Sequence, residues 1–251
     1  AQQAEITKLL LAIDELSCSN KLVLEKFRIF KASYEEDLLL GNNLTDCSRQ
    51  KTSIGFLPTN WKVEELTQMA WFQEGPGLRN WQFQDEGMKV INVTNLVDGN
   101  LDLSLTDRHV SLDEFSDKYK HFECDENDIV IASSGNSYCK HAIVRAKDLP
   151  LMMNTSVIRF KPINGTDYDF LNHLLKSNIF KKQIDRLITG AAQPNFGPIH
   201  LKKVFFPKPD DMEIQRKIGE KLKELDSTER EIASKIVHTS NLQHSLINKA
   251  F

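Results

Sequence analysis

The chain begins with forty residues that contain neither proline nor glycine, and this segment constrains its fold more than any other feature. It stops at Gly41-Asn42-Asn43, which is typical of a helix C-terminus, so the sequence predicts one long helix. Residues recur along it in alternating steps of four and three, from Ile6 to Leu38, and most of them are apolar. These steps define the seam of a coiled coil, which three polar residues interrupt: Ser17, Asn20 and Lys31.

The last forty residues repeat this pattern. The segment Pro207–Asp211 is a typical helix start, and a second seam runs from Ile218 to Ala250. Aligning Gln3 with Gln215 superimposes the first seam on the second. The chain therefore contains a repeat of two helices around one central block. The identical pairs are Gln3/Gln215, Ile6/Ile218, Leu10/Leu222, Asp14/Asp226 and Ser33/Ser245.

The length of the two helices favours pairing between them. Each is about 60 Å long at 1.5 Å per residue, which is more than a central block of this size covers along its own surface. We therefore expect a coiled-coil-like pair, formed either within one chain or between two chains. The residues expected in the interface are Ile6, Leu10, Ile13, Leu24, Phe27, Ile218, Leu222, Leu225, Ile232 and Ile236.

The central block mixes strand and helix patterns. One amphipathic run, Tyr168–Leu187, predicts a helix, and several short apolar or alternating runs predict strands. Many short strands with few helices favour an α+β fold over a doubly wound nucleotide-binding fold. We predict one mixed α/β domain, residues 42–207, between spacer helices over residues 1–41 and 208–251. The expected strand runs cover residues 88–95, 100–105, 128–135, 141–145, 154–160 and 200–207.

The sequence lacks the motifs of the common enzyme classes. It contains no G-x-G-x-x-G, G-x-x-x-x-G-K-[ST], G-x-S-x-G or H-E-x-x-H. Its seven histidines show no metal-ligand spacing, and its four cysteines are scattered, which favours reduced thiols over a disulfide framework or a zinc site. We expect no catalytic residue, no metal site and no cofactor in this chain. The cysteines are Cys18, Cys47, Cys124 and Cys139.

Composition and charge are those of an ordinary globular protein. The chain is 40% hydrophobic and 27% charged, and it contains neither a long apolar run nor the pattern of a signal peptide. We expect a cytoplasmic protein that does not cross a membrane. The formal net charge of −3 leaves nucleic-acid binding open, because such binding needs only a local basic face.

Side chains that suit DNA recognition follow several of the predicted strands and turns. Arginine and lysine contact guanine edges and phosphates, asparagine and glutamine contact adenine, and small hydroxyls accept either role. The candidate DNA-binding residues are Arg79, Lys89, Asn92, Asn95, Arg108, Ser133, Ser134, Asn136, Lys140, His141, Gln193 and Asn195.

The segment Ile188–Ile199 is rich in glycine, proline and amides. Within it, Pro194-Asn195-Phe196 is similar to the base-binding motif of amino-methyltransferases but lacks its second proline, and the chain has no glycine-rich loop for a methyl donor. The amides of Gln193 and Asn195 either contact DNA or hold the turn together.

In the order and spacing of four features, the chain resembles the DNA-specificity (S) subunit of type I restriction-modification systems. These features are the two helix entries Gln3–Asp14 and Gln215–Asp226, the domain opening Gly55–Trp61, the strand and loop Asp128–Gly135, and the closing segment Gly190–Phe196. Together they span nearly the whole chain.

The resemblance implies a non-catalytic subunit that recognises double-stranded DNA. In this family, two target-recognition domains each read one half of a bipartite site. The conserved helices pair antiparallel as a spacer, and methyltransferase (modification) subunits dock on them. The restriction subunit joins through the complex, and the partners carry the methyl donor, ATP and magnesium chemistry. The present chain has both helices but one domain, so it resembles a half-length form, either natural or a fragment.

An apolar seam left bare would expose a long stripe that monomers avoid. We therefore expect a homodimer with two-fold symmetry. Two other classes stay open on the sequence alone. One is a coiled-coil oligomerisation or scaffold protein whose central domain binds another protein, and the other is a small self-sufficient nuclease.

Overall fold

The computed structural model describes the backbone of residues 2–44, 47–188 and 194–250. The chain divides into two compact units. The helical unit comprises residues Ala1–Asn43 and Glu220–Phe251, and the central unit comprises Leu44–Gly219. No helix among the described residues is long and apolar enough to cross a membrane.

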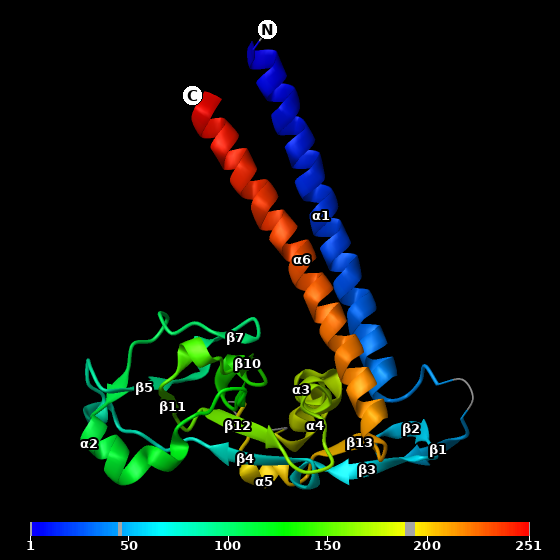
Figure 1. Ribbon diagram of the computed structural model, residues 1–251, viewed down its shortest axis with the longest axis vertical. Helices are drawn as coiled ribbons and strands as arrows, with labels where there is room; N and C mark the ends of the chain where they lie inside the picture. Colours follow the sequence, from blue (N-terminus) through cyan, green and yellow to red (C-terminus); the bar gives the residue numbers. More distant parts are fainter. Residues whose placement is uncertain (1, 45–46, 189–193, 251) are drawn as a thin grey trace. The chain divides into compact units, whose positions relative to one another are not determined.

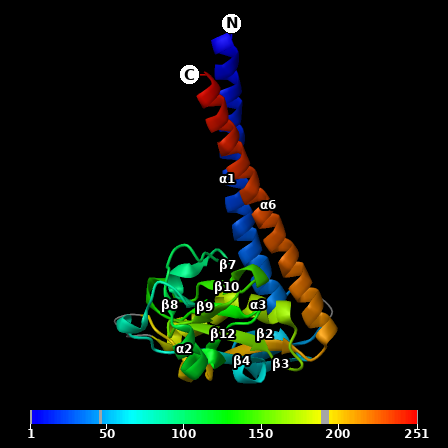
Figure 2. The same ribbon diagram turned by 60° about the vertical axis from the view of Figure 1, so that its left-hand side comes forward.

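The helical unit consists of α1 (Gln2–Leu39) and most of α6 (Met212–Ala250), which lie side by side with the two termini at the same end (Figures 1 and 2). The pair is therefore antiparallel. Solvent exposure along α1 follows the heptad pattern of its sequence. Between Glu5 and Ser33, the side chains that are at least partly buried are those of Ile6, Leu10, Ile13, Ser17, Asn20, Leu24, Phe27 and Lys31.

The seam of α6 is covered in the same manner. Leu222 is fully buried, and Leu225, Ile232 and Ile236 are partly buried at the spacing of the seam. Ile218, two residues before the helical unit begins, is a buried residue of the central unit.

Ionic contacts link the two helices in the part of the pair nearer to Leu39 and Glu220. The Arg28 Nε atom lies 2.6 Å from a Glu229 carboxylate oxygen, and Lys31 Nζ lies 2.7 Å from the other. Lys31 also contacts Asp226. Burial opposes the charge on Lys31, but the hydrogen bonds to Asp226 and Glu229 outweigh this effect and raise its pKa. The polar interruption of the seam at Lys31 is thus satisfied by two carboxylates of the opposite helix.

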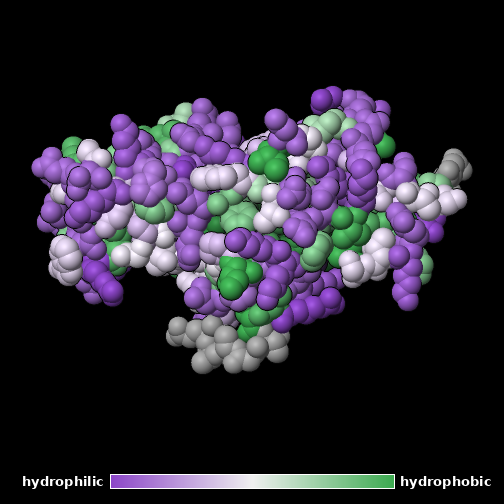
Figure 3. Space-filling model, turned by 90° about the horizontal axis from the view of Figure 1, so that it is seen from below, coloured by the Kyte–Doolittle hydropathy of each residue, from purple (hydrophilic) through white to green (hydrophobic). Residues whose placement is uncertain are grey.

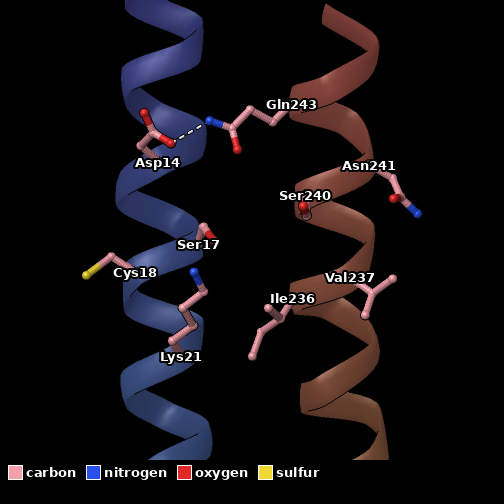
Figure 4. A pocket seen from close by; sticks show the side chains of 9 residues that line it. All are labelled: Asp14, Ser17, Cys18, Lys21, Ile236, Val237, Ser240, Asn241 and Gln243. Carbon is pink, nitrogen blue, oxygen red and sulfur yellow. Dashed lines mark hydrogen bonds between the residues drawn. The ribbon is translucent and has the colours of Figure 1, made fainter.

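A second polar link lies nearer the free ends of the helices. Gln243 Nε2 donates to Asp14 Oδ1 at 2.6 Å, and Figure 4 shows these two side chains pointing toward each other. They border a cleft of about 470 Å³ between the helices, where the seam carries Ser17 rather than a large apolar residue. The cleft is lined by Asp14, Ser17, Cys18, Lys21, Ile236, Val237, Ser240, Asn241 and Gln243.

The central unit is built on a four-stranded antiparallel sheet of order β10-β9-β12-β4. Its strands are β4 (Ala70–Glu74), β9 (Ile129–Ala132), β10 (His141–Ile143) and β12 (Val157–Pro162). All four residues of β9 are fully buried, as a central strand of apolar and β-branched residues should be. The helix α3 (Tyr168–Lys176) contacts β12 and buries Phe170, Leu171, Leu174 and Leu175.

A second, three-stranded sheet of order β11-β5-β8 stands beside the first (Figure 1). It consists of β5 (Met88–Ile91), β8 (His109–Val110) and β11 (Leu151–Met153). Three two-stranded ladders complete the unit: β1 (Arg49–Thr52) with β2 (Gly55–Pro58), β3 (Trp61–Glu65) with β13 (Phe205–Pro209), and β6 (Leu96–Val97) with β7 (Asn100–Leu101). The remaining helices and helical turns are α2 (Leu112–Glu114), α4 (Asn178–Leu187), α5 (Pro198–Leu201), η1 (Leu66–Gln68), η2 (Asn80–Gln82), η3 (Val93–Asn95), η4 (Phe115–Tyr119), η5 (Lys120–Phe122), η6 (Gly135–Ser137) and η7 (Ala146–Asp148).

Several elements differ from their sequence-based boundaries. The expected strand runs 88–95 and 100–105 form strands only over Met88–Ile91 and Asn100–Leu101. The helix expected over Tyr168–Leu187 is broken at Ser177, whose hydroxyl donates to the Leu174 carbonyl at 2.7 Å and accepts from the Phe180 N–H at 3.4 Å. A serine that caps a new helix competes with continuation of the old one. The closing strand begins at Phe205 rather than at residue 200, because Pro198 starts the short helix α5.

A buried arginine joins the strands of the main sheet. The Arg159 guanidinium contacts Gln73 Oε1 at 2.8 Å and Asp128 Oδ2 at 3.1 Å, and it lies over the ring of Trp71. Asp128 is 1% exposed, although it belongs to the acidic segment Asp125–Asp128 that precedes β9. It supplies the counter-charge that lets an arginine occupy the core.

Candidate nucleic-acid interface

Loops from three strands meet at one end of the main sheet. Strand β4 ends at Glu74 and β9 ends at Ala132, while β12 begins at Val157, which pairs with Ala132. Because β12 is antiparallel to both neighbours, these ends lie together (Figure 2). The segments that follow are polar: Ser133-Ser134 after β9 and Asn154–Ser156 before β12.

The segment after Gln193 adds a fourth strand-like stretch to this sheet end. The Phe196 N–H donates to the Ser133 carbonyl, and the Gly135 N–H donates to the Pro194 carbonyl, each at 2.9 Å. Phe196 is 1% exposed and packs edge-on against Phe180, whereas the neighbouring Asn195 is exposed. The buried ring fixes the backbone here and leaves the Asn195 amide in solvent.

The loop after β9 is anchored to α4 through the side chain of Tyr138. The Tyr138 hydroxyl donates to an Asp185 carboxylate oxygen at 2.7 Å, and Lys181 Nζ lies 4.6 Å from the centroid of the tyrosine ring. Hydrogen bonds to Tyr138 and Asp185 raise the pKa of Lys181. Between these anchors, the turn Gly135–Ser137 exposes Asn136, and Lys140 is exposed after it.

The structure divides the sequence-predicted DNA-binding residues into two groups. Exposed side chains belong to Arg79, Arg108, Asn136, Lys140 and Asn195, of which Arg108 lies over the Phe83 ring at 4.8 Å. Ser134 is partly buried beside Asn195, and Gln193 lies outside the described residues.

The other candidates have internal partners. Asn92 accepts from Thr94, and Asn95, which is fully buried, donates to the Asp102 carbonyl at 2.9 Å and accepts from the Asn92 N–H at 3.0 Å. Ser133 is fully buried as well. Lys89 contacts Asp107 at 2.6 Å, and His141 Nε2 lies 2.6 Å from Asn172 Oδ1. The structure therefore brings the residues around 133–140 and Asn195 together, and it places Asn92 and Asn95 in local capping networks.

Two prominent side chains were not among the sequence-predicted residues. Glu74 is a half-buried carboxyl at the end of β4, where burial raises its pKa and a weak hydrogen bond from Thr155 opposes that rise. Trp81 is 79% exposed in the segment between β4 and β5. The only sequence signal for it was the framing of this segment by Gly75-Pro76-Gly77 and Gly87, which predicts a defined turn but not an exposed ring.

Among the residues that the structure describes, no group of three or more His, Cys, Asp or Glu side chains is arranged to hold a metal ion. Burial raises the pKa of Cys124 and of Cys139 to about 12, so both thiols stay protonated at neutral pH. The exposed groups at the sheet end include the amides of Asn136 and Asn195 and the ammonium of Lys140, which are suited to hydrogen bonding with a polar polymer.

Comparison with known proteins adds independent evidence. The family described as "Type I restriction modification DNA specificity domain" matches residues 58–238. The type I restriction enzyme MjaVIII specificity subunit of Methanocaldococcus jannaschii is 26% identical over 232 residues, covering 90% of this chain and 53% of that protein. The EcoAI specificity subunit of Escherichia coli is 28% identical over 176 residues, covering 68% of this chain and 29% of that protein. The chain thus spans about half the length, or less, of these curated relatives.

Solved structures share the fold. The type I restriction-modification S subunit from M. genitalium has a TM-score of 0.63 and 17% sequence identity, and the match covers 99% of this chain and 60% of that one. The HsdS subunit from Thermoanaerobacter tengcongensis also has a TM-score of 0.63, with 13% identity over 99% of this chain and 56% of that one. Since the matched family region covers most of the chain, including the sheet end and its exposed polar loops, this chain belongs to the type I restriction-modification DNA specificity family.

Proposed function

We propose that this chain is a non-catalytic DNA sequence-recognition subunit of a type I restriction-modification complex, which directs methyltransferase and restriction subunits to a bipartite site. The observation that carries the proposal is the gathering of the exposed Asn136, Lys140 and Asn195 side chains at one end of the main sheet, within a region matched by the specificity family. The family match disfavours a scaffold protein with a protein-binding central domain.

In this proposal the exposed residues divide by chemistry. Asn136 and Asn195 offer amides that pair with adenine edges in the major groove. Arg79, Arg108 and Lys140 neutralise phosphates and fix the register on the duplex. The methyl donor, ATP and magnesium belong to the partner subunits.

A binding screen with the assembled complex tests the proposal. The chain is combined with its modification subunit and incubated with a randomised duplex library, and the retained DNA is sequenced. A shared sequence element, lost on the Asn136→Ala and Asn195→Ala substitutions, is the expected result. Retained DNA without any sequence preference contradicts the proposal.

The helical unit carries a second apolar stripe, which supports the proposed association with other chains. Leu9, Leu16, Val23 and Phe30 recur every seven residues on α1 and are 48%, 53%, 48% and 53% exposed. Together with the seam residues Ile6, Ile13, Asn20 and Phe27 they form a row in steps of three and four that is apolar except at Asn20, which is the geometry of a second helix contact. Soluble monomers rarely expose such a row.

We infer that this second stripe, called the outer stripe from here on and defined by Leu9, Leu16, Val23 and Phe30, pairs two copies of the chain about a two-fold axis. Modification subunits then bind the resulting helical bundle. A two-fold dimer of one recognition domain reads an inverted repeat of a single half-site.

The Leu16→Glu variant tests the dimer. A charge buried at the dimer contact costs about 2 kcal/mol or more per copy, so we expect the variant to be monomeric at micromolar concentration in light scattering, where the unaltered chain is dimeric. Leu11→Glu is the matched control, because Leu11 is 58% exposed on the opposite face of α1. A monomeric unaltered chain overturns the dimer proposal.

A further inference from the structure

Trp81 differs from the other two tryptophans in its surroundings. Trp61 is 1% exposed, and Trp71 lies under the Arg159 guanidinium at 5.0 Å. Trp81 is 79% exposed, which makes it the most exposed large apolar side chain of the described residues. Burying an indole is strongly favourable, so an indole kept in water on a well-ordered turn points to a partner.

The turn that carries Trp81 is fixed from within. The next residue, Gln82, is 6% exposed, and its side-chain amide donates to Glu114 at 2.7 Å and to the Tyr119 hydroxyl at 3.0 Å. Its amide oxygen accepts from the Arg79 N–H at 2.8 Å, which closes the turn. Leu78 and Phe83, on either side, pack against the core cluster of Met88, Val90, Val110, Phe115 and Met152.

Two glycines fix the ends of the same segment by close approach to neighbouring backbone. A Cβ added at Gly75 would lie 2.2 Å from the Asn154 carbonyl oxygen, and one added at Gly87 would lie 2.1 Å from the Val110 carbonyl oxygen. Gly87 also has a φ of +128°, which side chains rarely allow. The segment 75–87 is therefore a preformed loop whose outward residue is Trp81.

Charge identifies the class of partner. Arg79, two residues before Trp81, is exposed, and no side-chain partner is present for it among the described residues. Arg108 is exposed as well. It lies over the Phe83 ring, because the pairing of Gln84 with His109 brings the two segments together. An exposed aromatic ring, with one exposed arginine on its own turn and another over the neighbouring Phe83 ring, matches a nucleic-acid duplex, in which bases stack on the ring and phosphates contact the cations. The exposed carboxylates Asp85 and Glu86 follow Phe83 along the chain, so Arg79, which precedes the ring, is the arginine of this segment farther from them in sequence.

We propose that Trp81 is a stacking wedge that packs its indole against a base step of the DNA duplex while Arg79 and Arg108 hold the flanking phosphates. This inference rests on the proposed DNA-recognition function. The indole would stack on one base and separate it from the next base. Such a contact selects base steps that deform easily, whereas the amides select bases by their hydrogen-bonding groups.

The test compares Trp81→Ala and Trp81→Phe with the unaltered chain, each assembled with the modification subunit, on the duplex that the unaltered complex selects. Loss of a stacked base weakens binding about 5- to 150-fold. We expect this loss for Trp81→Ala, a smaller one for Trp81→Phe, and an unchanged slope of affinity against salt for both. Arg79→Ala is expected to reduce that slope by about one phosphate contact. Leu112→Ala, at a site 60% exposed on α2, is the control and keeps full affinity.

A fluorescence measurement reports the contact directly. With Trp71 replaced by Phe, DNA that carries 2-aminopurine at successive positions should quench Trp81 emission at one step only. If the unaltered complex selects a sequence but Trp81→Ala binds it equally well and no position quenches, the wedge is wrong and the proposed function stands. If Trp81→Ala instead loses the modification subunit in a pull-down while its DNA affinity is kept, Trp81 is a protein contact and the wedge is also wrong. An unaltered complex without sequence preference overturns both proposals.

Discussion

At the scale of single residues, burial decides whether an amide of the central unit supports the fold or faces solvent. Asn95 and Asn136 are the same side chain in loops that follow strands of the two sheets. Asn95 is fully buried, and its amide accepts from the Asn92 N–H and donates to the Asp102 carbonyl. Asn136 is exposed on the turn after β9. Their substitutions should therefore separate stability from DNA binding.

Replacing Asn95 by alanine leaves the buried Asn92 N–H and the partly buried Asp102 carbonyl without this partner. We expect a loss of about 1–3 kcal/mol in the free energy of unfolding, measured by urea denaturation. Asn136→Ala should change this free energy by less than about 0.5 kcal/mol, because its side chain is in solvent. Equal stability of the two variants would show that the capping network of Asn95 is not formed.

Glu74 gives a pH-dependent prediction. Burial raises the pKa of this carboxyl in the folded state, so its ionisation costs stability as the pH rises through its ordinary value of 4.5. Glu74→Gln removes this cost and should stabilise the chain at pH 7, by less than about 1 kcal/mol because water screens a half-buried group. Below pH 4.5 both folded and unfolded carboxyls are protonated, and the difference in melting temperature between the variant and the unaltered chain should vanish.

At the scale of elements, the contact between α1 and α6 combines an apolar seam with ionic links, and the links differ in strength. Lys31 is 15% exposed and faces both Asp226 and Glu229, whereas Arg28 is 60% exposed and contacts Glu229 alone. We expect Lys31→Ala to cost about 1–3 kcal/mol, because it removes the Lys31 cation from two partly buried carboxylates and leaves Glu229 with Arg28 alone. Arg28→Ala should cost only about 0.2–1 kcal/mol. Helix melting followed by circular dichroism measures both.

The same links set a pH window for the helix pair. Hydrogen bonds raise the pKa of Lys31, so its contribution is complete below 10.5 and is lost as the pH rises through the raised value. Burial works against ionisation of Glu229, but Lys31 and Arg28 outweigh it and lower the pKa, so its contribution is present above 4.5 and is lost as the pH falls through the lowered value. If the melting temperature of the helix pair decreases when the pH is changed within the range 4.5 to 10.5, these two ionic contributions are not the ones that stabilise the pair.

The elements also show what the sequence could and could not predict. The heptad steps from Ile6 to Lys31 match the exposure of α1, because a seam depends only on local spacing and helix geometry. The break at Ser177 was missed because the apolar period continues through it, and only the capping hydroxyl separates α3 from α4. The grouping of Ser134 with Asn195 depends on strand pairing between distant segments, which no local pattern encodes. Trp81 was missed for a similar reason, since its exposure follows from the burial of its neighbours.

At the scale of the whole molecule, the two units differ in how they are stabilised. Most of the fully buried apolar residues lie in Leu44–Gly219, whereas the helical unit buries few, among them Ile13, Leu39 and Leu222. All three tryptophans, Trp61, Trp71 and Trp81, lie in the central unit. The two units can therefore be followed separately in one intact chain.

We expect unfolding in urea to occur in two steps at low protein concentration. The ellipticity at 222 nm should fall before the tryptophan emission shifts, because the long helices lose structure first. If two chains pair through the outer stripe, raising the protein concentration should move the first transition to higher urea and leave the second in place. A single coincident transition at every concentration would mean that the units unfold together.

The pairing of β3 with β13 has a consequence for how such a chain can change over generations. Trp61 pairs with Pro209 and Glu65 with Phe205, so the first and last long strands of the central unit are neighbours in one ladder. The segment between these two strands therefore begins and ends at neighbouring positions of the same ladder. A recombination event that replaces this segment by one of different length leaves the β3 and β13 strands, and the positions where the segment begins and ends, unchanged. The ladder therefore keeps the two ends of the segment 66–204 at neighbouring positions, whatever the length of the segment between them.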